Sequence, residues 1–253
     1  MNDCFKIFDI NLVEQSTLTP SSENALFPAS NIKDARRSKV FRAPGNSANL
    51  ILDFQETSEI NGIFIVADKR NGFGVSTVTI EFNGTSNFTT PAHTVTVPLS
   101  VKFGIGFISF DTIEYRFARI VMTSTLGYCE LANVFIGKEI EMERTISFGW
   151  TVKDQELSTK SYNRYGQLFV DVILRQKQFA MTFKNMNKED LNALQTLLDR
   201  VGESKPFYIM LGNDKMVVDY RRYSGPVYFE DIPTEANPLF GRYTLPTSLR
   251  EVT

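Results

Sequence analysis

The chain has 253 residues, a formal net charge of −2, and 42% apolar and 22% charged residues. These proportions are typical of a globular protein and argue against disorder. A general nucleic-acid-binding surface needs an excess of Lys and Arg, and the nearly balanced charge of this chain argues against one. The 21 Phe and 9 Tyr favour strands over helices.

The first residues, MNDCFKIFDINL, lack the basic and apolar regions of an export signal. No stretch is long and apolar enough for a membrane-spanning helix. Cys4 and Cys129 are the only cysteines, which is too few for a disulfide scaffold. These features predict synthesis in a reducing cytoplasm, and they leave the redox state of the two thiols open.

Residues 1–137 contain many short strand-like segments separated by Gly, Pro and Asn. Residues 75–84 alternate Val78, Ile80 and Phe82 with polar residues, as in a strand with one buried face, and end at an Asn-Gly turn signal. Residues 60–68 are almost all apolar, which indicates a strand buried on both faces. Because no amphipathic helix of ordinary length occurs here, this region is predicted to be a jelly-roll β-sandwich.

Residues 138–253 add further strands and one helix, at about 187–202. Asn187 is a suitable N-cap and Gly202 a suitable C-terminal residue. A hairpin is expected around residues 212–214. The fold is therefore predicted to be mainly β, with a jelly roll over 1–137 and a β-sandwich or barrel domain carrying one helix over 138–253. The apolar stripe of the helix consists of Leu191, Leu194, Leu198 and Val201.

Four segments of the first region occur in an order that resembles the discoidin (F5/8 type C) family of galactose-binding-like jelly rolls. They are FPASNIKDARRSKVFRA, ANLILDFQETSEINGIFIVAD, VSTVTIEFNGTSNF and YRFARIVMTSTLGYCELANVFIGKEI. The individual motifs are loose, and Phe41 stands where that family usually has Trp. The resemblance covers just over half of the chain. It implies that the basic stretch of residues 27–43 is a surface loop of a jelly roll.

In that family the loops at one end of the jelly roll form the ligand site. Polar side chains there would hold sugar hydroxyls, and Phe73 would stack on a sugar face; the alternative is that the charges are solvated and Phe73 anchors a turn. The resemblance also implies that the first and last strands pair, which would bring Cys4 and Cys129 close together. Oxygen ligands for Ca²⁺ could come from Asn31, Asp34 or Glu130. The polar ligand candidates are Asn31, Asp34, Arg36, Arg37, Lys39 and Arg70.

The second region resembles the C-terminal portion of tail-tip proteins of tailed bacteriophages. The similarity lies in the order of its segments, from NVFIGKEIEMERTISFGW through the helix to KPFYIML. It implies a domain that builds rings around the tail axis. Trp150 is then either an interface anchor or a core residue. Tyr162 and Tyr165, in the polar segment STKSYNRYG, would suit a subunit contact.

Enzymatic motifs are missing from the sequence. It has no G-x-G-x-x-G, Walker or G-x-S-x-G motif, and two Cys and one His cannot form a Cys/His metal cluster. His93 lies in a Thr- and Pro-rich strand-like segment, where a structural role is expected. The chain is therefore predicted not to be an enzyme and to need no cofactor.

The sequence and its resemblances predict a structural virion protein of a phage tail tip, made in the host cytoplasm and located in the tail. The second domain would form a homo-oligomeric ring with other tail proteins as neighbours. The jelly roll would face outward and contact host-surface carbohydrate, with neither nucleic-acid binding nor membrane insertion. The alternative is a free carbohydrate-binding module protein without catalysis.

Overall fold

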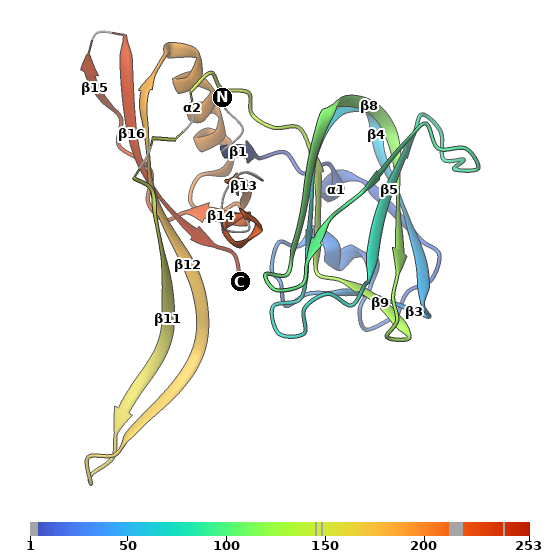
Figure 1. The fold of residues 1–253 in the computed structure, drawn as a ribbon, viewed down its shortest axis with the longest axis horizontal. Helices are drawn as coiled ribbons and strands as arrows, with labels where there is room; N and C mark the ends of the chain where they lie inside the picture. The colour runs from blue at the N-terminus through green and yellow to red at the C-terminus, as the bar shows by residue number, and fades with distance from the viewer. Residues whose placement is uncertain (1–4, 145, 148, 213–219, 240) are drawn as a thin grey trace.

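The computed structural model describes residues 5–144, 146–147, 149–212, 220–239 and 241–253, and these ranges consist mostly of β-strands. The strands form two units that lie side by side, a curled β-sandwich and a second sheet with a helix packed on it (Figure 1). The predicted mainly β fold with a jelly roll and one sizeable helix is confirmed.

The jelly roll is built around two long antiparallel strands, β4 (Ser47–Val66) and β8 (Ile105–Thr123). Both curve over one end of the unit (Figure 1), where their register shifts between Asp53 and Ser58 and again after Ile60. The strand expected at 60–68 is therefore the second part of one long bent strand that begins at Ser47. The other elements of this unit are α1 (Leu12–Gln15), β2 (Thr17–Pro20), η1 (Ala29–Lys33), β3 (Phe41–Pro44), β5 (Thr77–Asn83), β6 (His93–Thr96), β7 (Leu99–Ser100), β9 (Tyr128–Leu131) and β10 (Asn133–Gly137).

Strand pairing gives the main sheet of the jelly roll the order β10-β4-β8-β5-β6, with β2 on β4, β7 on β8, and a separate β3–β9 pair. The alternation predicted for β5 is confirmed, because Val78, Ile80 and Phe82 are fully buried. The apolar run at the end of β4 is also buried on both faces. Ile63 packs in the jelly-roll core, whereas Phe64 packs in a cluster that faces the second unit.

The second unit is a sheet with the order β1-β13-β14-β16-β12-β11, to which β15 adds on β16. Its first strand comes from the beginning of the chain: β1 pairs with β13 from Phe5↔Leu211 to Phe8↔Tyr208. Residues 5–8 thus lie in the second sheet and not in the jelly roll, and the predicted hairpin at 212–214 falls mainly outside the described residues. The strands are β1 (Phe5–Phe8), β11 (Thr151–Tyr162), β12 (Leu168–Met186), β13 (Phe207–Leu211), β14 (Gly225–Phe229), β15 (Ala236–Leu239) and β16 (Arg242–Glu251).

Helix α2 (Lys188–Val201) covers one face of this sheet, as its sequence predicts. The Asn187 side chain accepts a hydrogen bond from the Asp190 amide, which satisfies one of the free donors at the helix start. Gly202 ends the helix with a positive φ of 53°. The apolar stripe packs against Phe183 and Leu245 of the sheet to form the second core.

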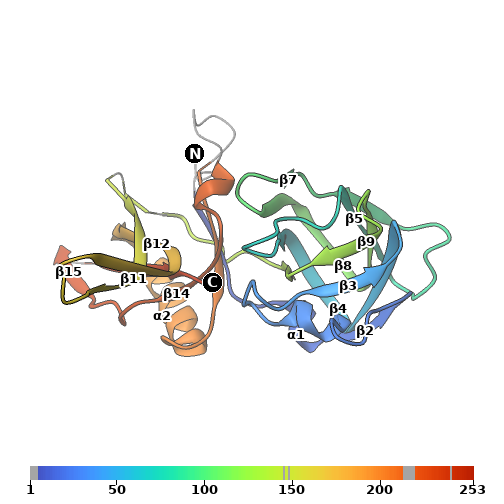
Figure 2. The ribbon, with the colours of Figure 1, turned by 90° about the horizontal axis from the view of Figure 1, so that it is seen from below.

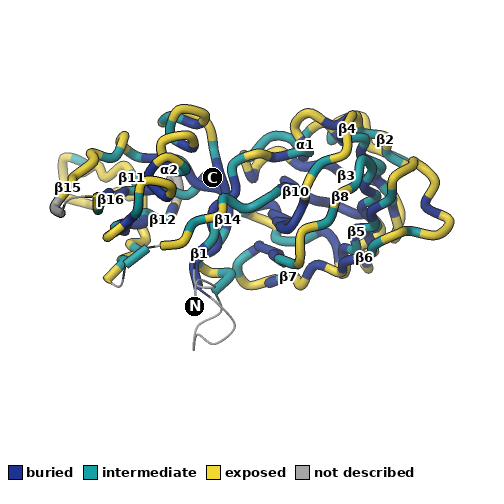
Figure 3. Tube along the Cα trace, turned by 90° about the horizontal axis from the view of Figure 1, so that it is seen from above, coloured by how far each residue is buried: buried dark blue, intermediate teal, exposed yellow. Residues whose placement is uncertain are grey.

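An aromatic cluster joins the two units. Phe8 of β1 packs edge-to-face against Phe64, Phe107 and Phe135 of the jelly roll, with ring centroids 5.3 to 5.9 Å apart. Tyr208 of β13 packs on the same cluster. Buried positions accordingly run through the middle of the molecule, where β1, β14 and β10 meet (Figure 3). The cluster makes the contact between the units a continuation of the hydrophobic core.

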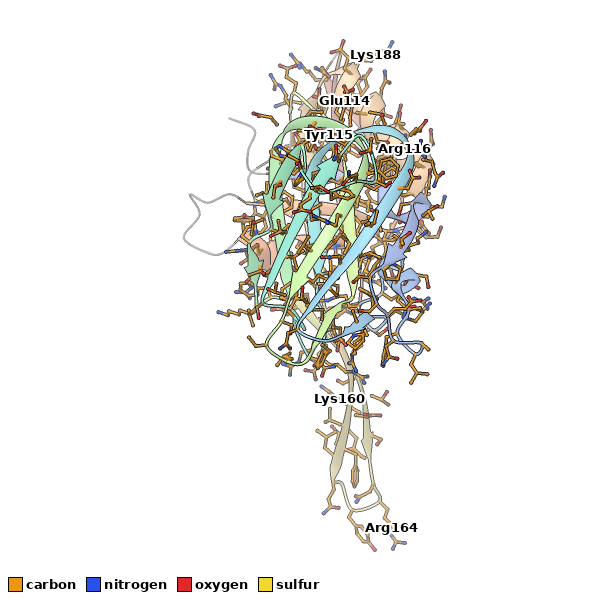
Figure 4. All side chains as sticks on the ribbon, turned by 90° about the vertical axis from the view of Figure 1, so that its right-hand side faces the viewer. Glu114, Tyr115, Arg116, Lys160, Arg164 and Lys188 are labelled. Carbon is orange, nitrogen blue, oxygen red and sulfur yellow. The ribbon has the colours of Figure 1, made fainter. Side chains whose placement is uncertain are left out.

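The outer parts of β11 and β12 extend beyond both units as a two-stranded ribbon, here called the arm (residues 153–175). Figure 4 shows Arg164 at its far end and Lys160 between the tip and the body, on the opposite side of the molecule from Tyr115 in the bend of β8. The two strands pair with each other throughout, whereas β12 pairs with β16 only from Gln178 onward. Among the described residues, the arm therefore has no third strand paired with it.

Candidate functional site

An open groove of about 750 Å³ lies between the jelly roll and the base of the arm, and we call it the interunit groove. The jelly roll contributes the loops of residues 67–72 and 101–104, and the second unit contributes both strands of the arm base and the end of β16. The two units lie next to each other at this point (Figures 1 and 2). Its charged lining residues are Arg37, Asp68, Lys69, Arg70, Lys102, Asp154, Glu156, Arg175, Lys177 and Glu251.

Several of these charges hold the walls of the groove together. Arg175 forms an ion pair with Glu156 at 2.8 Å across the two strands of the arm, and Lys177 lies 3.6 Å from Glu251. Lys69 of the jelly roll donates a hydrogen bond to the carbonyl of Arg175. Its half-buried position in the groove lowers the pKa of the Lys69 ammonium group.

Arg37 is buried, with only 6% of its surface exposed, in contrast to the surface position expected for a ligand-binding loop. Its Nε donates to the Ala67 carbonyl at 3.0 Å, and its Nη1 lies 3.4 Å from Glu251 of the second unit. Burial lowers the pKa of this guanidinium, although Arg remains charged in proteins. The position of Arg37 is that of a bridge between the units, with one side lining the groove.

Arg70 and Lys102 present their charges to the groove from two exposed jelly-roll loops. The Asp68 carboxylate shapes the first loop by accepting hydrogen bonds from the amides of Arg70 and Asn71. Lys102 lies over the Phe103 ring at 5.3 Å. Within the described parts of the chain, neither Arg70 nor Lys102 has a carboxylate at ion-pair distance, so both can turn toward a ligand.

A second groove, of about 570 Å³, collects four of the other predicted ligand residues, Asn31, Asp34, Arg36 and Lys39. Asp34 forms ion pairs with Arg36 at 2.5 Å and Lys39 at 2.9 Å. The hydrogen bond from Arg36 holds the pKa of the Asp34 carboxyl well below its usual range. The single Asp34 carboxylate is thus shared by two cations, and the Asn31 amide is already bonded to the Val40 carbonyl.

The predicted ligand residues thus separate into two grooves, with Arg37 and Arg70 in the interunit groove. Phe73 lies in neither groove and packs, partly buried, against the jelly-roll core. The aromatic side chain that does line the interunit groove is Phe103, which sequence reasoning missed because nothing local distinguishes its loop. Whether these residues bind a ligand stays a prediction.

The residues considered for Ca²⁺ are held by other partners. Asp34 is paired as described, and the buried Glu130 lies 2.5 Å from Arg42. In the part of the chain that is described, no group of three or more His, Cys, Asp or Glu side chains is arranged to hold a metal ion. A calcium site therefore stays a prediction, and no cluster of ligand side chains among the described residues supports it.

A buried hydrogen-bond chain links the second unit to the loop that precedes Asp34. The Tyr208 hydroxyl donates to the Asn133 side chain at 2.5 Å, and the Asn133 amide donates to the carbonyls of Ile32 and Asp34 at 2.9 and 3.2 Å. Asn133 and Tyr208 are almost fully buried, and burial raises the pKa of the phenol. This chain fixes the loop relative to both units.

The three predicted interface residues lie in different surroundings. Trp150 is partly buried and packs edge-to-face on Tyr223 at 5.4 Å, beside the second core. Tyr162 and Tyr165 are 71% and 73% exposed at the end of the arm. Of the three, only the tyrosines are therefore fully available for a contact with another molecule.

The remaining singular residues take structural positions. His93 lies in β6 and packs near Phe82 and Phe110, with centroids 6.3 and 5.7 Å from its ring. Cys129 is a buried free thiol, and burial raises its pKa. Cys4, its predicted neighbour, lies outside the described residues. No helix among the described residues has the length and apolar character needed to span a membrane.

No protein-family model matches the chain, and no curated protein matches it. Among solved structures it is similar to a carbohydrate-binding module of Clostridium perfringens in complex with GalNAc-β-1,3-galactose, at 11% identity and a TM-score of 0.43, over 51% of this chain and 100% of that chain. It is also similar to the family 32 carbohydrate-binding module of C. perfringens NanJ in complex with galactose, at 15% identity and a TM-score of 0.43, over 52% and 98%.

A third similar structure is the lectin domain of lectinolysin complexed with Lewis b antigen, at 11% identity and a TM-score of 0.45, over 51% of this chain and 96% of that chain. The structural neighbours are thus carbohydrate-binding modules and lectin domains that resemble about half of the chain. At these identities and TM-scores the likeness carries no argument about function, which has to come from the site itself.

Proposed function

We propose that the protein is a non-catalytic carbohydrate-binding component of a phage tail tip, which binds host-surface glycans through the interunit groove and assembles through its second unit. The observation that carries the binding part is that two exposed cations, Arg70 and Lys102, and the aromatic ring of Phe103 line the same open groove. Guanidinium and ammonium groups donate hydrogen bonds that can hold sugar hydroxyls, and an aromatic ring can pack on the apolar face of a sugar ring.

The shape of the groove suits an oligosaccharide. It is open to solvent and bounded by rigid elements, since the loop of residues 68–72 is held by the Asp68 carboxylate and the arm base by cross-strand pairing. A chain of sugars could therefore lie along it without a large rearrangement. A single site of this kind would bind weakly, and several sites on one assembly would gain avidity when they engage together.

The test is a glycan array of neutral and acidic oligosaccharides probed with the full chain, followed by calorimetry on each glycan that binds. Arg70→Ala is expected to weaken binding roughly tenfold or more, because a charge-assisted hydrogen bond is lost. Lys188→Ala removes an exposed positive charge at the opposite end of the molecule (Figure 4) and serves as the matched control.

Arg36→Ala distinguishes the two grooves, because Arg36 lines only the second one. Binding that survives Arg70→Ala but is lost in Arg36→Ala would move the site to the second groove. Absence of binding to every glycan on the array, with the protein folded, would refute the carbohydrate-binding proposal.

The tail-tip part of the proposal needs a separate test. An antibody raised against the purified chain should label the tail tips of the phage particles that carry it, when these are imaged by electron microscopy. Particles whose tails stay unlabelled, together with a monomeric purified chain that binds a glycan, would favour the alternative of a free carbohydrate-binding module.

A further inference from the structure

Exposed apolar side chains are concentrated on the arm. Of the eleven large apolar side chains that are exposed in the described parts of the chain, six lie between residues 157 and 170. Scattered apolar residues are normal on a protein surface, but a contiguous group marks a contact surface. The arm is therefore the strongest candidate for an interaction surface on this molecule.

The strand register places three of these side chains on one face. Tyr162 is directly opposite Leu168, and Lys160 is directly opposite Val170. Opposed residues share a face of the ribbon, as do residues two apart on one strand. Tyr162, Leu168 and Val170, which are 71%, 49% and 45% exposed, thus share one face with the charged Lys160, and we call it the apolar face of the arm.

The opposite face of the same ribbon is mostly polar. Near the tip it carries Phe169 together with Ser161, Thr159 and Asp171, and Leu157, which is 38% exposed, lies on it nearer the arm base, at the register shift. An isolated two-stranded ribbon is only marginally stable in water, and it gains stability when one face packs on another surface. Because the polar face can remain in water, the apolar face is the one that requires a cover.

A matching surface exists on the other side of the second sheet, away from α2. It is a shallow groove of about 480 Å³, here called the outer groove, with a wall formed by residues 231–234. Its floor carries short side chains that leave room for larger ones. Ile232 of the wall is 61% exposed, and the carboxylate of Asp231 lies beside it at the surface. The floor residues include Thr151, Ala180, Thr182, Pro246 and Ser248.

The outer groove and the arm of one chain cannot meet. Thr151 lines the groove, and Tyr162 lies eleven residues further along β11, which corresponds to roughly 36 Å along a strand. The charged residues that line the outer groove are Asp231 and Lys184. In the docked arrangement Arg164, exposed at the end of the arm, would pair with Asp231, while the large apolar residues cover Ile232 and Pro246.

We propose that the apolar face of the arm docks into the outer groove of a second copy of the chain. The contact is head-to-tail, because two different surfaces of the protein meet. Repetition of such a contact closes into a ring when the rotation between copies allows it, and otherwise gives a filament. The inference rests on the assembly part of the proposed function and names the surfaces that carry it out.

The first test measures the oligomeric state of the full chain by light scattering over a wide range of concentrations. The native chain is expected to self-associate, and Leu168→Ser is expected to weaken association roughly tenfold or more, as for a central apolar contact. Phe169→Ser, on the polar face of the same strand, is the matched control and should leave association unchanged. A monomer at every concentration, or equal effects of the two substitutions, would overturn the proposal.

The second test identifies the two surfaces by disulfide cross-linking in a Cys4→Ser background, in which the remaining Cys129 is buried. One variant carries Tyr165→Cys and the other Ile232→Cys. A covalent dimer is expected when the two variants are mixed and oxidised, and not when either is oxidised alone. An oligomer that forms without this cross-link would place the interface elsewhere and overturn the proposal.

Failure of this proposal is separable from failure of carbohydrate binding. Leu168 lies on the outer arm and does not line the interunit groove. The Leu168→Ser protein, measured as a monomer, should therefore bind any glycan found on the array as tightly as the native chain does. If Leu168→Ser loses association but keeps glycan binding, only the role of the arm has been tested. Arg70→Ala should instead weaken glycan binding and leave association intact.

Discussion

Gly62→Ala tests whether the aromatic cluster makes the two units fold as one. Gly62 lies in β4 against Phe8 of β1, and a Cβ atom at this position would be 2.1 Å from the Phe8 ring. Ordinary contact requires 3.4–4 Å, so the ring would have to move by about 1 Å or more. Phe8 is fully buried between three other rings, which leaves it no free space to enter.

The added methyl group should therefore shift β1, which is the edge strand of the second sheet. Overpacking of this kind typically costs about 1–3 kcal/mol of the free energy of unfolding, and the short distance predicts the upper part of that range. Gly84→Ala is the matched control, because no atom lies within 4 Å of its added Cβ, and it should change stability by less than about 0.5 kcal/mol.

The measurement is urea unfolding followed by both fluorescence and circular dichroism. A double-mutant cycle then adds Phe8→Leu, which removes the ring that the new methyl group strikes. Because the two sites touch, the combined effect should be smaller than the sum of the single effects. The explanation would be refuted by a Gly62→Ala protein as stable as Gly84→Ala, or by fully additive effects of the two substitutions.

Two further changes test the buried hydrogen-bond chain and the charged loop next to it. Tyr208→Phe removes the donor to Asn133 and leaves a buried amide oxygen without its partner, so it should lower the free energy of unfolding in urea by about 1–3 kcal/mol. Tyr162→Phe, at an exposed site, should not change it measurably. Equal effects of the two substitutions would contradict this explanation. For Asp34, the ion pairs lower the pKa in the folded state, so its contribution to stability is present above the usual carboxyl pKa and is lost as the pH falls below about 4. Comparison of unfolding between pH 7 and pH 2 should show a smaller acid-induced loss in Asp34→Asn than in the native chain, and identical pH profiles would show that the ion pairs contribute nothing.

Local sequence patterns were sufficient to predict those strands and helix ends whose formation depends on neighbouring residues in the chain. The alternation around Ile80 identified β5, because a strand with one buried face must repeat every two residues. Asn187 and Gly202 located the ends of α2, because helix termini need specific capping groups. The basic stretch of residues 27–43, expected to be a surface loop, belongs to the jelly roll but contains the short helix η1 and the start of β3, and Arg37 within it is buried.

Only the tertiary structure decided how distant segments combine. Residues 5–8 pair with β13 near the other end of the chain, and Phe8 in the same strand packs on Phe64 of the jelly roll. Arg37 is a charged residue of a type usually found at the surface, yet it is buried and lies against Glu251, more than 200 positions away in the chain. Residues 138–253 were expected to contain further strands, but the projection of β11 and β12 as an arm depends on where β16 stops pairing with β12. Sequence by itself determined the elements, because their periodicity and caps are local. The grooves, the arm and the joint between the units were decided by contacts between residues far apart in the chain, which no local pattern encodes.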